Sequence, residues 1–250
     1  FESTEDWARH YQEQETLVEK SSDERFDYLR CGTKEQPILG RVGDNVRIDW
    51  GYYYLASEKG KHSVATGCKR ALRNAFVNDG SIASGEGKAM VLGCNLGEVG
   101  NKAASNYFMV GYDDIYSIQY FGENLRPYWN RDGKSTIEEQ FAKAADEYKS
   151  LMRRSAKFDN ELMAEATEAG GKEYADLCAL AYRQTVAAHK LVVTPNGELA
   201  LFSKENFSNG CLGTVDITYP SIPMFLLYNT ELAKALLNFI FDYSESGKWT

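Results

Sequence analysis

The hydrophobic pattern of this chain changes its period near residue 130, and this change constrains the fold more than any other feature. Before it, short runs such as 46–57 alternate apolar and polar residues, and glycine-rich turns separate the runs. After it, apolar residues recur every three or four positions, as they do along 141–152. We therefore expect an α+β protein, with an antiparallel β-sandwich-like module at 1–130 and α-hairpins at 131–250.

Several runs of the first part have the composition of strands. The strand candidates are 46–57, 89–96, 106–111 and 115–121. Residues 71–77 fit either a short helix or an irregular edge strand. Short strands separated by turns favour a sandwich or a stacked antiparallel sheet.

The second part opens with a helix start signal. Ser135 is a suitable N-cap residue, and Glu138, three residues on, completes a capping box. The helix is expected to run to Ala166, with room for a break at 155–159, before a pair of glycines stops it.

Further helices follow and suggest an array of α-hairpins. A second helix is expected at 172–191, a β-hairpin with an Asn-Gly turn at 192–203, and a last helix at 232–243. Such arrays need several helix pairs to bury a core, so we expect this chain to hold only the opening part of one. The absence of an initiator methionine also indicates a piece of a longer chain.

The composition excludes several classes of function. A net charge of −8 argues against a nucleic-acid partner, because binding phosphates requires clustered lysines and arginines. No stretch approaches about 18 uninterrupted apolar residues, so no membrane span is expected. The five cysteines are scattered without a Cys-x-x-Cys pair, which argues against structural zinc and favours buried free thiols, with a disulfide as the alternative. Glycine-rich pieces lack phosphate-loop spacing, and no metal or cofactor is predicted.

One polar stretch of the second part stands out, FSKENFSNGCLGTVDITYPSIPMFLL at 202–227. It places charged and amide side chains between two apolar segments, and its glycines and prolines prevent it from forming one regular element. Both flanks resemble helices of a buried core, so we expect the stretch to cap a hollow between them. Loops held by rigid elements often carry binding and catalysis, although a solvated connector with an Asn-Gly turn is the plainer alternative.

Several segments resemble one known family. They are YADLCALAYRQTVAAHK at 174–190, FSKENFSNGC at 202–211 and TVDITYPSIPMFLLYN at 214–229, with further similarity at 31–57 and 112–129. They are similar to the glutaminase A family of secreted fungal and bacterial proteins. The resemblance implies a β-sandwich-like module followed by an α/α toroid of the six-hairpin glycosidase kind. It also implies an extracytoplasmic location and hydrolysis of glutamine to glutamate and ammonia, with most of the toroid missing from this chain.

Amide hydrolysis needs an acid, a base and hydrogen-bond donors for the developing oxyanion. Glu205 and Asp216 are the ionisable pair best suited to act as acid and base. The predicted substrate-binding residues are Lys204, Asn206, Asn209 and Tyr219. Turn capping is the structural alternative for the two asparagines, and helix or loop capping for Asp216. A nucleophile–base pair of Ser203 with Lys204 is disfavoured, because adjacent side chains usually point apart.

A carbohydrate-active enzyme or a sugar-binding protein is the first alternative, with glutamine replaced by a sugar as the small-molecule substrate. The same carboxylates would then cleave a glycosidic bond, and aromatic side chains would form the walls of the cleft. The candidate walls are Trp50, Tyr52, Tyr54 and Trp129, for which core packing is the more common role. A non-catalytic scaffold that self-associates through its truncated helical face is the second alternative.

Two other residues are assigned structural roles. Asp49 falls on the polar face of the 46–57 strand, where an ion pair with Arg47 or Arg41 across the sheet is expected. His189 falls late in the second helix, and we expect a structural histidine there rather than a catalytic base.

Overall fold

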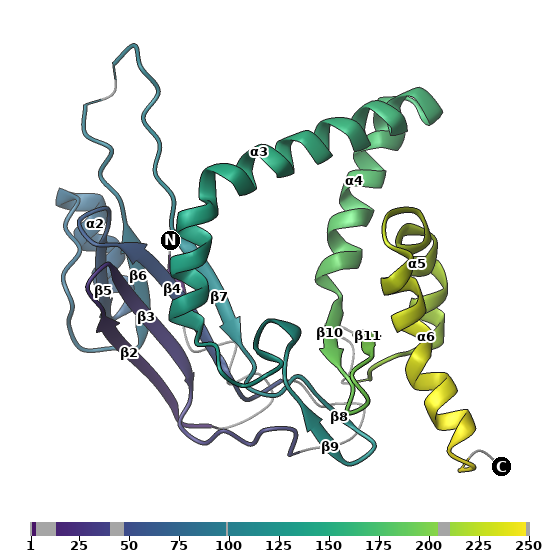
Figure 1. Ribbon diagram of the computed structural model, residues 1–250. Helices are drawn as coiled ribbons and strands as arrows, with labels where there is room; N and C mark the ends of the chain where they lie inside the picture. Colours follow the sequence, from purple (N-terminus) through teal and green to yellow (C-terminus); the bar gives the residue numbers. More distant parts are fainter. Residues whose placement is uncertain (1, 4–13, 41–47, 99, 205–210, 249–250) are drawn as a thin grey trace. The chain divides into compact units, whose positions relative to one another are not determined.

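A computed structural model describes residues 2–3, 14–40, 48–98, 100–204 and 211–248 of the chain (Figure 1). The described residues divide into two compact units. Unit 1 ends at Ile115, and unit 2 begins at Tyr116. Each unit is considered by itself below.

Unit 1 contains two antiparallel sheets and one helix among its described residues. The larger sheet has the order β2-β3-β4-β7, formed by Thr16–Ser22, Phe26–Thr33, Tyr52–Glu58 and Met109–Asp113. The smaller sheet has the order β1-β6-β5, formed by Glu2–Ser3, Ala89–Gly93 and Ser63–Gly67. Helix α2, Lys69–Asp79, follows β5. The expected antiparallel β-rich first part is confirmed, and the ambiguous run at 71–77 is helical.

The two sheets of unit 1 pack through one apolar cluster. Leu29 and Cys31 of β3 and Leu55 of β4 contact Met90 and Leu92 of β6, and all five side chains are almost fully buried. Because side chains alternate between the faces of a strand, residues two apart on β3 and on β6 reach the same core. This arrangement of facing antiparallel sheets is sandwich-like.

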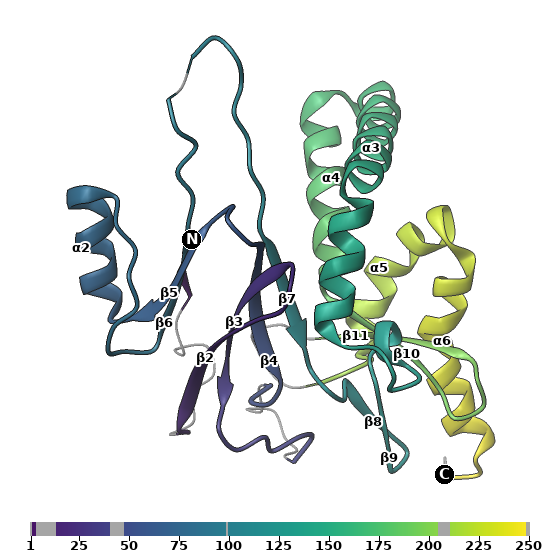
Figure 2. The same ribbon diagram turned by 60° about the vertical axis from the view of Figure 1, so that its left-hand side comes forward.

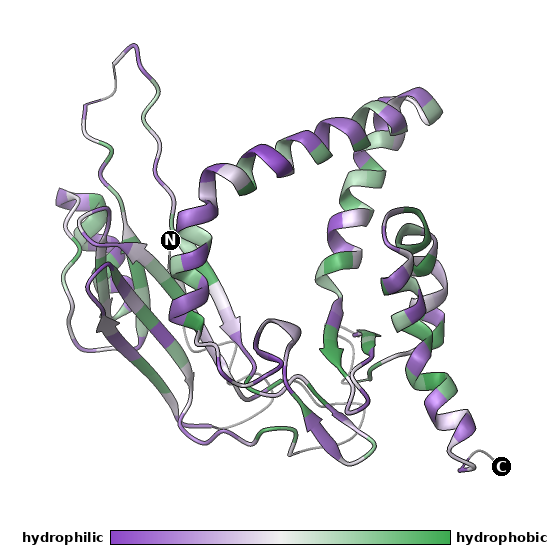
Figure 3. Cartoon of the chain, viewed as in Figure 1, coloured by the Kyte–Doolittle hydropathy of each residue, from purple (hydrophilic) through white to green (hydrophobic). Residues whose placement is uncertain are grey.

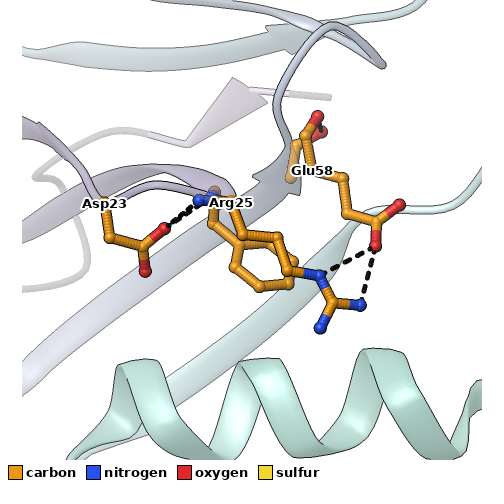
Figure 4. A network of polar contacts seen from close by, with 5 residues as sticks. Asp23, Arg25 and Glu58 are labelled. Carbon is orange, nitrogen blue, oxygen red and sulfur yellow. Dashed lines mark hydrogen bonds and ion pairs between the residues drawn. The ribbon is translucent and has the colours of Figure 1, made fainter.

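The β2–β3 turn is tied to the end of β4 by polar contacts (Figure 4). The Asp23 carboxylate accepts hydrogen bonds from the backbone N–H groups of Arg25 (2.7 Å) and Phe26 (2.6 Å). The Arg25 guanidinium in turn lies 2.9 Å from a carboxylate oxygen of Glu58. Exposed ion pairs stabilise little, so the Asp23 hydrogen bonds define this turn more than the Arg25–Glu58 pair does.

Gly51 lies where the backbone enters β4, and no other residue type fits there without strain. Its φ is +84°, and an added Cβ would lie 2.5 Å from the carbonyl oxygen of Asp113. We expect Gly51→Ala to lower the free energy of unfolding of unit 1 by about 2–3 kcal/mol, because it combines backbone strain with overpacking. Urea unfolding measures this loss.

Gly60 is the matched control for that substitution. Its φ is +76°, but an added Cβ would meet no atom within 4 Å. Gly60→Ala should therefore lose only the backbone term, about 1 kcal/mol. Equal losses in the two variants would show that the close approach of the added Cβ to the Asp113 carbonyl does not destabilise the fold.

Unit 2 begins with a small hairpin and continues with helices around a second hairpin (Figures 1 and 2). The strands are β8 Ile118–Tyr120, β9 Glu123–Leu125, β10 His189–Val193 and β11 Leu199–Ser203. The helices are η1 Tyr128–Asn130, α3 Ile137–Gly170, α4 Lys172–Ala187, α5 Val215–Tyr228 and α6 Thr230–Glu245. The prediction of C-terminal helical hairpins is confirmed.

The start of α3 differs from the prediction by one residue. Thr136, not Ser135, is the N-cap, and its side chain and that of Glu139 form the reciprocal hydrogen bonds of a capping box. The sequence offers two overlapping pairs of hydroxyl and carboxylate residues. The pair that is used leaves Ile137 buried at the first helical position.

The expected ends of both long helices, Ala166 and residue 191, differ from those in the structure. Helix α3 runs from Ile137 to Gly170 without the break allowed at 155–159. Helix α4 ends at Ala187 rather than at residue 191, and His189 opens strand β10. The pairing of His189–Val193 with Leu199–Ser203 overrides the helical spacing of the apolar residues up to 191.

The β10–β11 hairpin presents two apolar faces and organises unit 2. Val192, Ala200 and Phe202 point to one face, where they contact Ile118 and Tyr120 of β8. The opposite face carries three leucines, and its contacts are with α5 and α6. The residues of that second cluster are Leu191, Leu199, Leu201, Phe225, Ala233, Ala235 and Leu236. The predicted Asn-Gly hairpin is confirmed, with Gly197 at a φ of +86° in its turn.

Within the part of the chain that the structure describes, no helix combines the length and apolar character needed to cross a bilayer.

Candidate functional site

The polar region predicted to carry the site, 202–227, begins in β11 and ends in α5, so its upstream flank is a strand and not a helix. Residues 204–214 form the stretch that connects β11 to α5. Of the predicted site residues, Glu205, Asn206 and Asn209 lie outside the described residues. Lys204, Asp216 and Tyr219 are described.

Both ends of this stretch are fastened to the β10–β11 hairpin. The backbone N–H of Lys204 donates to the carbonyl of Ala188 (2.8 Å), and that of Gly213 donates to the carbonyl of Ser203 (2.8 Å). Lys204 also forms an isolated antiparallel bridge with Leu212. These contacts bring the chain back on itself, so that the two ends of the stretch lie side by side.

Glycine is required at 213 for this closure. Its φ is +68°, and an added Cβ would lie 2.6 Å from the ring of Phe239 on α6. The backbone therefore passes directly over this ring on its way to α5.

Asp216 and Tyr219 lie on the exposed side of α5. Asp216 is in the first turn of the helix, where the dipole favours a negative charge, and Tyr219 is 78% exposed. Residues three apart lie next to each other on a helix, so the two side chains share one face. The carboxylate can accept a proton or a hydrogen bond from a molecule in solution.

The two prolines of α5 change the hydrogen bonding beneath these residues. Pro220 and Pro223 lie inside the helix. A proline has no N–H, so the carbonyls of Asp216 and Tyr219, each four residues earlier, lack their usual helical donor. These two backbone carbonyls in the first half of α5 can therefore accept a hydrogen bond from another donor.

A network of buried polar side chains lies under the stretch. Ser203 is fully buried, and its Oγ lies 3.2 Å from Oγ1 of Thr218 and 3.4 Å from the carbonyl oxygen of Thr214. Ser221 donates to the carbonyl of Thr218 (3.0 Å). Nε2 of His189 lies 3.5 Å from the Ser221 hydroxyl.

The environment of His189 disfavours the charged imidazolium. Burial lowers the pKa of His189, although a hydrogen bond to the carbonyl oxygen of Thr185 (2.5 Å from Nδ1) opposes this effect. The expected place of this histidine in a helix is wrong, because it belongs to β10, and its structural role stays a prediction. Residue types alone did not indicate its link to Ser221, which depends on α5 packing against the hairpin.

A separate groove of about 540 Å³ lies among α3, α4 and α5. Its lining is largely apolar and aromatic, and Glu165 contributes a carboxylate. The aromatic members include Tyr174, Tyr182 and Tyr228, and Figure 3 shows hydrophobic and hydrophilic residues side by side along α5. Lys204, Asp216 and Tyr219, the predicted residues that the structure describes, do not line this groove.

Three of the four aromatic residues considered as walls of a sugar cleft are buried or have other partners. Trp50 and Tyr54 are buried in unit 1, and the Trp50 indole N–H donates to the carbonyl of Asp114 (2.8 Å). The ring of Tyr52 lies under the Arg30 guanidinium at 4.4 Å. Trp129 belongs to unit 2 and is half-buried. Trp50 and Tyr54 are thus core residues.

The expected position of Asp49 is wrong. It is 4% exposed, not on a polar face, and its carboxylate accepts a hydrogen bond from the Gln14 side chain (2.8 Å). The alternation assumed from residue 46 does not hold, because β4 begins only at Tyr52. Arg41 and Arg47, the predicted partners, lie outside the described residues.

Among the described residues, no group of three or more His, Cys, Asp or Glu side chains is arranged to hold a metal ion. Cys68, Cys94 and Cys178 are free thiols.

Comparison with known proteins places the chain in a family. Residues 1–165 match the family model described as a domain of unknown function, DUF5127, and residues 171–250 match the Glutaminase A six helical-hairpin domain. The first match ends within α3, and the second begins at Gly171, between α3 and α4.

Two curated proteins are similar to the chain. Glutaminase A of Aspergillus oryzae is 28% identical over 218 residues, which cover 81% of this chain and 31% of that protein. A protein named probable glutaminase, from Arthroderma benhamiae, is 34% identical over 93 residues, or 37% of this chain and 11% of that protein. The chain thus spans less than a third of the length of these relatives. No solved structure matches it. The first model covers more than half of the chain, which therefore belongs to the family with the DUF5127 domain, and the second model and both relatives show its relationship to the glutaminase A family.

Proposed function

We propose that this chain supplies part of an amidohydrolase that converts glutamine to glutamate and ammonia, with its site on the stretch between β11 and α5. Family membership supports the reaction. One structural observation supports the location: both ends of the stretch are hydrogen-bonded to a buried hairpin, through Lys204 and Gly213. Reacting groups need such a fixed support, because small misplacements reduce catalysis strongly.

Two side chains that the structure describes, Asp216 and Lys204, have the chemistry that two steps of this reaction need. Asp216 offers an exposed carboxylate for proton transfer, and Lys204 offers a cation for the substrate carboxylate or the developing oxyanion. The backbone carbonyls of Asp216 and Tyr219 lack their usual helical donors, because a proline stands four residues after each. They can accept hydrogen bonds from the ammonium group of glutamine. Glu205, Asn206 and Asn209 complete the proposed set on the basis of their residue types.

Ammonia release from glutamine by the natural full-length protein is the direct test of this function. We expect release that saturates with glutamine and that is absent with glutamate. A ligand that binds the native state raises its melting temperature, so glutamine should also stabilise the protein. No ammonia release, together with stabilisation by oligosaccharides, would contradict the proposal and favour a carbohydrate-active protein.

We also propose an extracytoplasmic location, which rests on the resemblance to secreted fungal and bacterial proteins. Fractionation of source cells, followed by immunodetection, tests it.

Self-association through exposed apolar helix surfaces remains a prediction for the isolated chain. The surfaces include Leu177 of α4 (62% exposed) and Leu227 of α5 (73% exposed), and sedimentation would measure the association.

A further inference from the structure

His189 and Ser203 face each other at the open end of the β10–β11 hairpin. They are paired in the strand register, so their side chains project to the same side of the ladder. That side also carries the leucines that contact α5 and α6. A polar pair at the edge of an apolar interface can specify how the helix is seated, because buried polar groups must find partners.

Ser203 finds its partners in the first turns of α5. Its hydroxyl lies between the carbonyl oxygen of Thr214 and Oγ1 of Thr218, and both Ser203 and Thr218 are almost fully buried. Ser203 directly precedes Lys204, and its own carbonyl accepts from Gly213. One residue thus contacts both the end of the strand and the start of the helix.

His189 makes the second connection. Its Nδ1 donates to the carbonyl oxygen of Thr185, which leaves Nε2 as an acceptor, and the single Ser221 proton can be donated either to Nε2 (3.5 Å) or to the carbonyl of Thr218 (3.0 Å). Its ring also meets the ring of Phe225 edge-on, with centroids 5.1 Å apart. The imidazole therefore joins the last turn of α4 to the middle of α5.

A serine close to a histidine whose other nitrogen is held resembles a nucleophile and its base. The surroundings argue against that role. Ser221 is 8% exposed, its shorter hydrogen bond goes to the carbonyl of Thr218, and it does not line the groove among α3, α4 and α5. A substrate could not reach its oxygen without moving α5.

We propose that His189 and Ser203 are positioning residues, which fix Lys204 and Asp216 relative to each other by seating α5 on the hairpin. This proposal rests on the proposed function. Lys204 follows Ser203 directly, and Asp216 lies in the turn of α5 that Ser203 holds. His189 prevents α5 from rotating or sliding by holding the next turn at Ser221 and Phe225.

Three variants of the full-length protein test the proposal. His189→Phe keeps an aromatic ring against Phe225 but removes both nitrogens, whereas His189→Gln keeps an acceptor near Ser221. Ser203→Ala removes the hydroxyl alone. We expect His189→Phe to lower kcat for glutamine about 100-fold with little change in KM, and His189→Gln to recover about tenfold of that loss. Ser203→Ala should lower kcat in the same way.

Amide hydrogen exchange provides a readout that does not depend on activity. The N–H groups of Lys204 and Gly213 should exchange about fivefold faster in His189→Phe and Ser203→Ala, because each variant loses a hydrogen bond that supports them. His62→Phe is the matched control. It removes a similar contact between a histidine and a serine, Ser57, in unit 1, and should change neither readout.

The outcomes separate this proposal from the function on which it rests. If the wild-type protein releases no ammonia, the proposed function fails, and the exchange of the two amides still decides whether His189 and Ser203 hold the stretch. Wild-type exchange in both His189→Phe and Ser203→Ala would overturn the proposal. So would a loss of kcat that His189→Gln does not recover, since that result would mean a general loss of stability.

Discussion

Replacing Asp216 by asparagine in the full-length protein is expected to lower kcat for glutamine hydrolysis by about 10²–10⁴-fold, the usual contribution of a positioned acid or base. The fold should survive, because the side chain is exposed in the first turn of α5. The lost interaction with the helix dipole is expected to cost only about 0.3–1 kcal/mol of stability. Steady-state ammonia release measures the change in kcat, and thermal unfolding of the same samples measures the change in stability.

Glu173→Gln is the matched control for Asp216→Asn. Glu173 is also an exposed acid in the first turn of a helix, α4, so its replacement should cost the same small amount of stability. It should leave kcat unchanged. If the two variants have equal activity, Asp216 is only a favourable charge at a helix start and is removed from the proposed site.

Glu205→Gln is the companion experiment for the other proposed carboxylate. An acid and a base that act in one reaction are not additive, so the double variant should be little slower than the slower single variant. A product of the two separate losses would mean that the residues act independently. Unchanged activity in Glu205→Gln alone would remove Glu205 from the site.

The general architecture could be predicted because it follows from local periodicity. Alternation in the first part and helical spacing in the second indicated antiparallel sheets followed by α-hairpins, and the structure confirms both. The Asn196-Gly197 turn located the β10–β11 hairpin, because this dipeptide favours the tight turn that hairpins need. These signals are contained within about ten residues of sequence.

Features that depend on contacts distant in sequence could not be predicted. The helical pattern of 172–191 gave no reason to end the helix at Ala187. That end is set by the pairing of His189 with Ser203, fourteen positions later in the chain. Strands β2 and β3 were not predicted, because their buried and exposed residues do not alternate regularly. In β3, residues on both faces are buried. Burial on two faces weakens the period of two.

The candidate site shows the same division. The residue types located the polar stretch. They did not predict the backbone hydrogen bonds of Lys204 and Gly213 that hold it to the hairpin. The buried network of Ser203, Thr218 and Ser221 gave no signal in the sequence beyond small hydroxyl residues near prolines. Its partners come from separate elements, and only the packing of α5 on the hairpin brings them together.

The β10–β11 hairpin should be the most sensitive part of unit 2. We expect Phe202→Ala to lower the free energy of unfolding of this unit by about 3–5 kcal/mol, the range for a buried aromatic residue cut to alanine. Phe202 is 6% exposed, its ring stacks on Phe239 of α6 with centroids 4.7 Å apart, and it meets Tyr120 of β8 at 6.2 Å. Removing the ring leaves a cavity between β11, β8 and α6, and these elements cannot easily move together to fill it.

Hydrogen exchange across unit 2, with the strands of unit 1 as an internal reference, would measure this loss. Phe241→Ala is the control, since Phe241 lies on α6 but is 57% exposed, and its loss should be below about 1 kcal/mol. Similar losses in the two variants would mean that the hairpin does not organise the unit. Because Phe202 directly precedes Ser203, its removal should also speed exchange at Lys204, so that one substitution in the core reaches the proposed site through the strand that supports it.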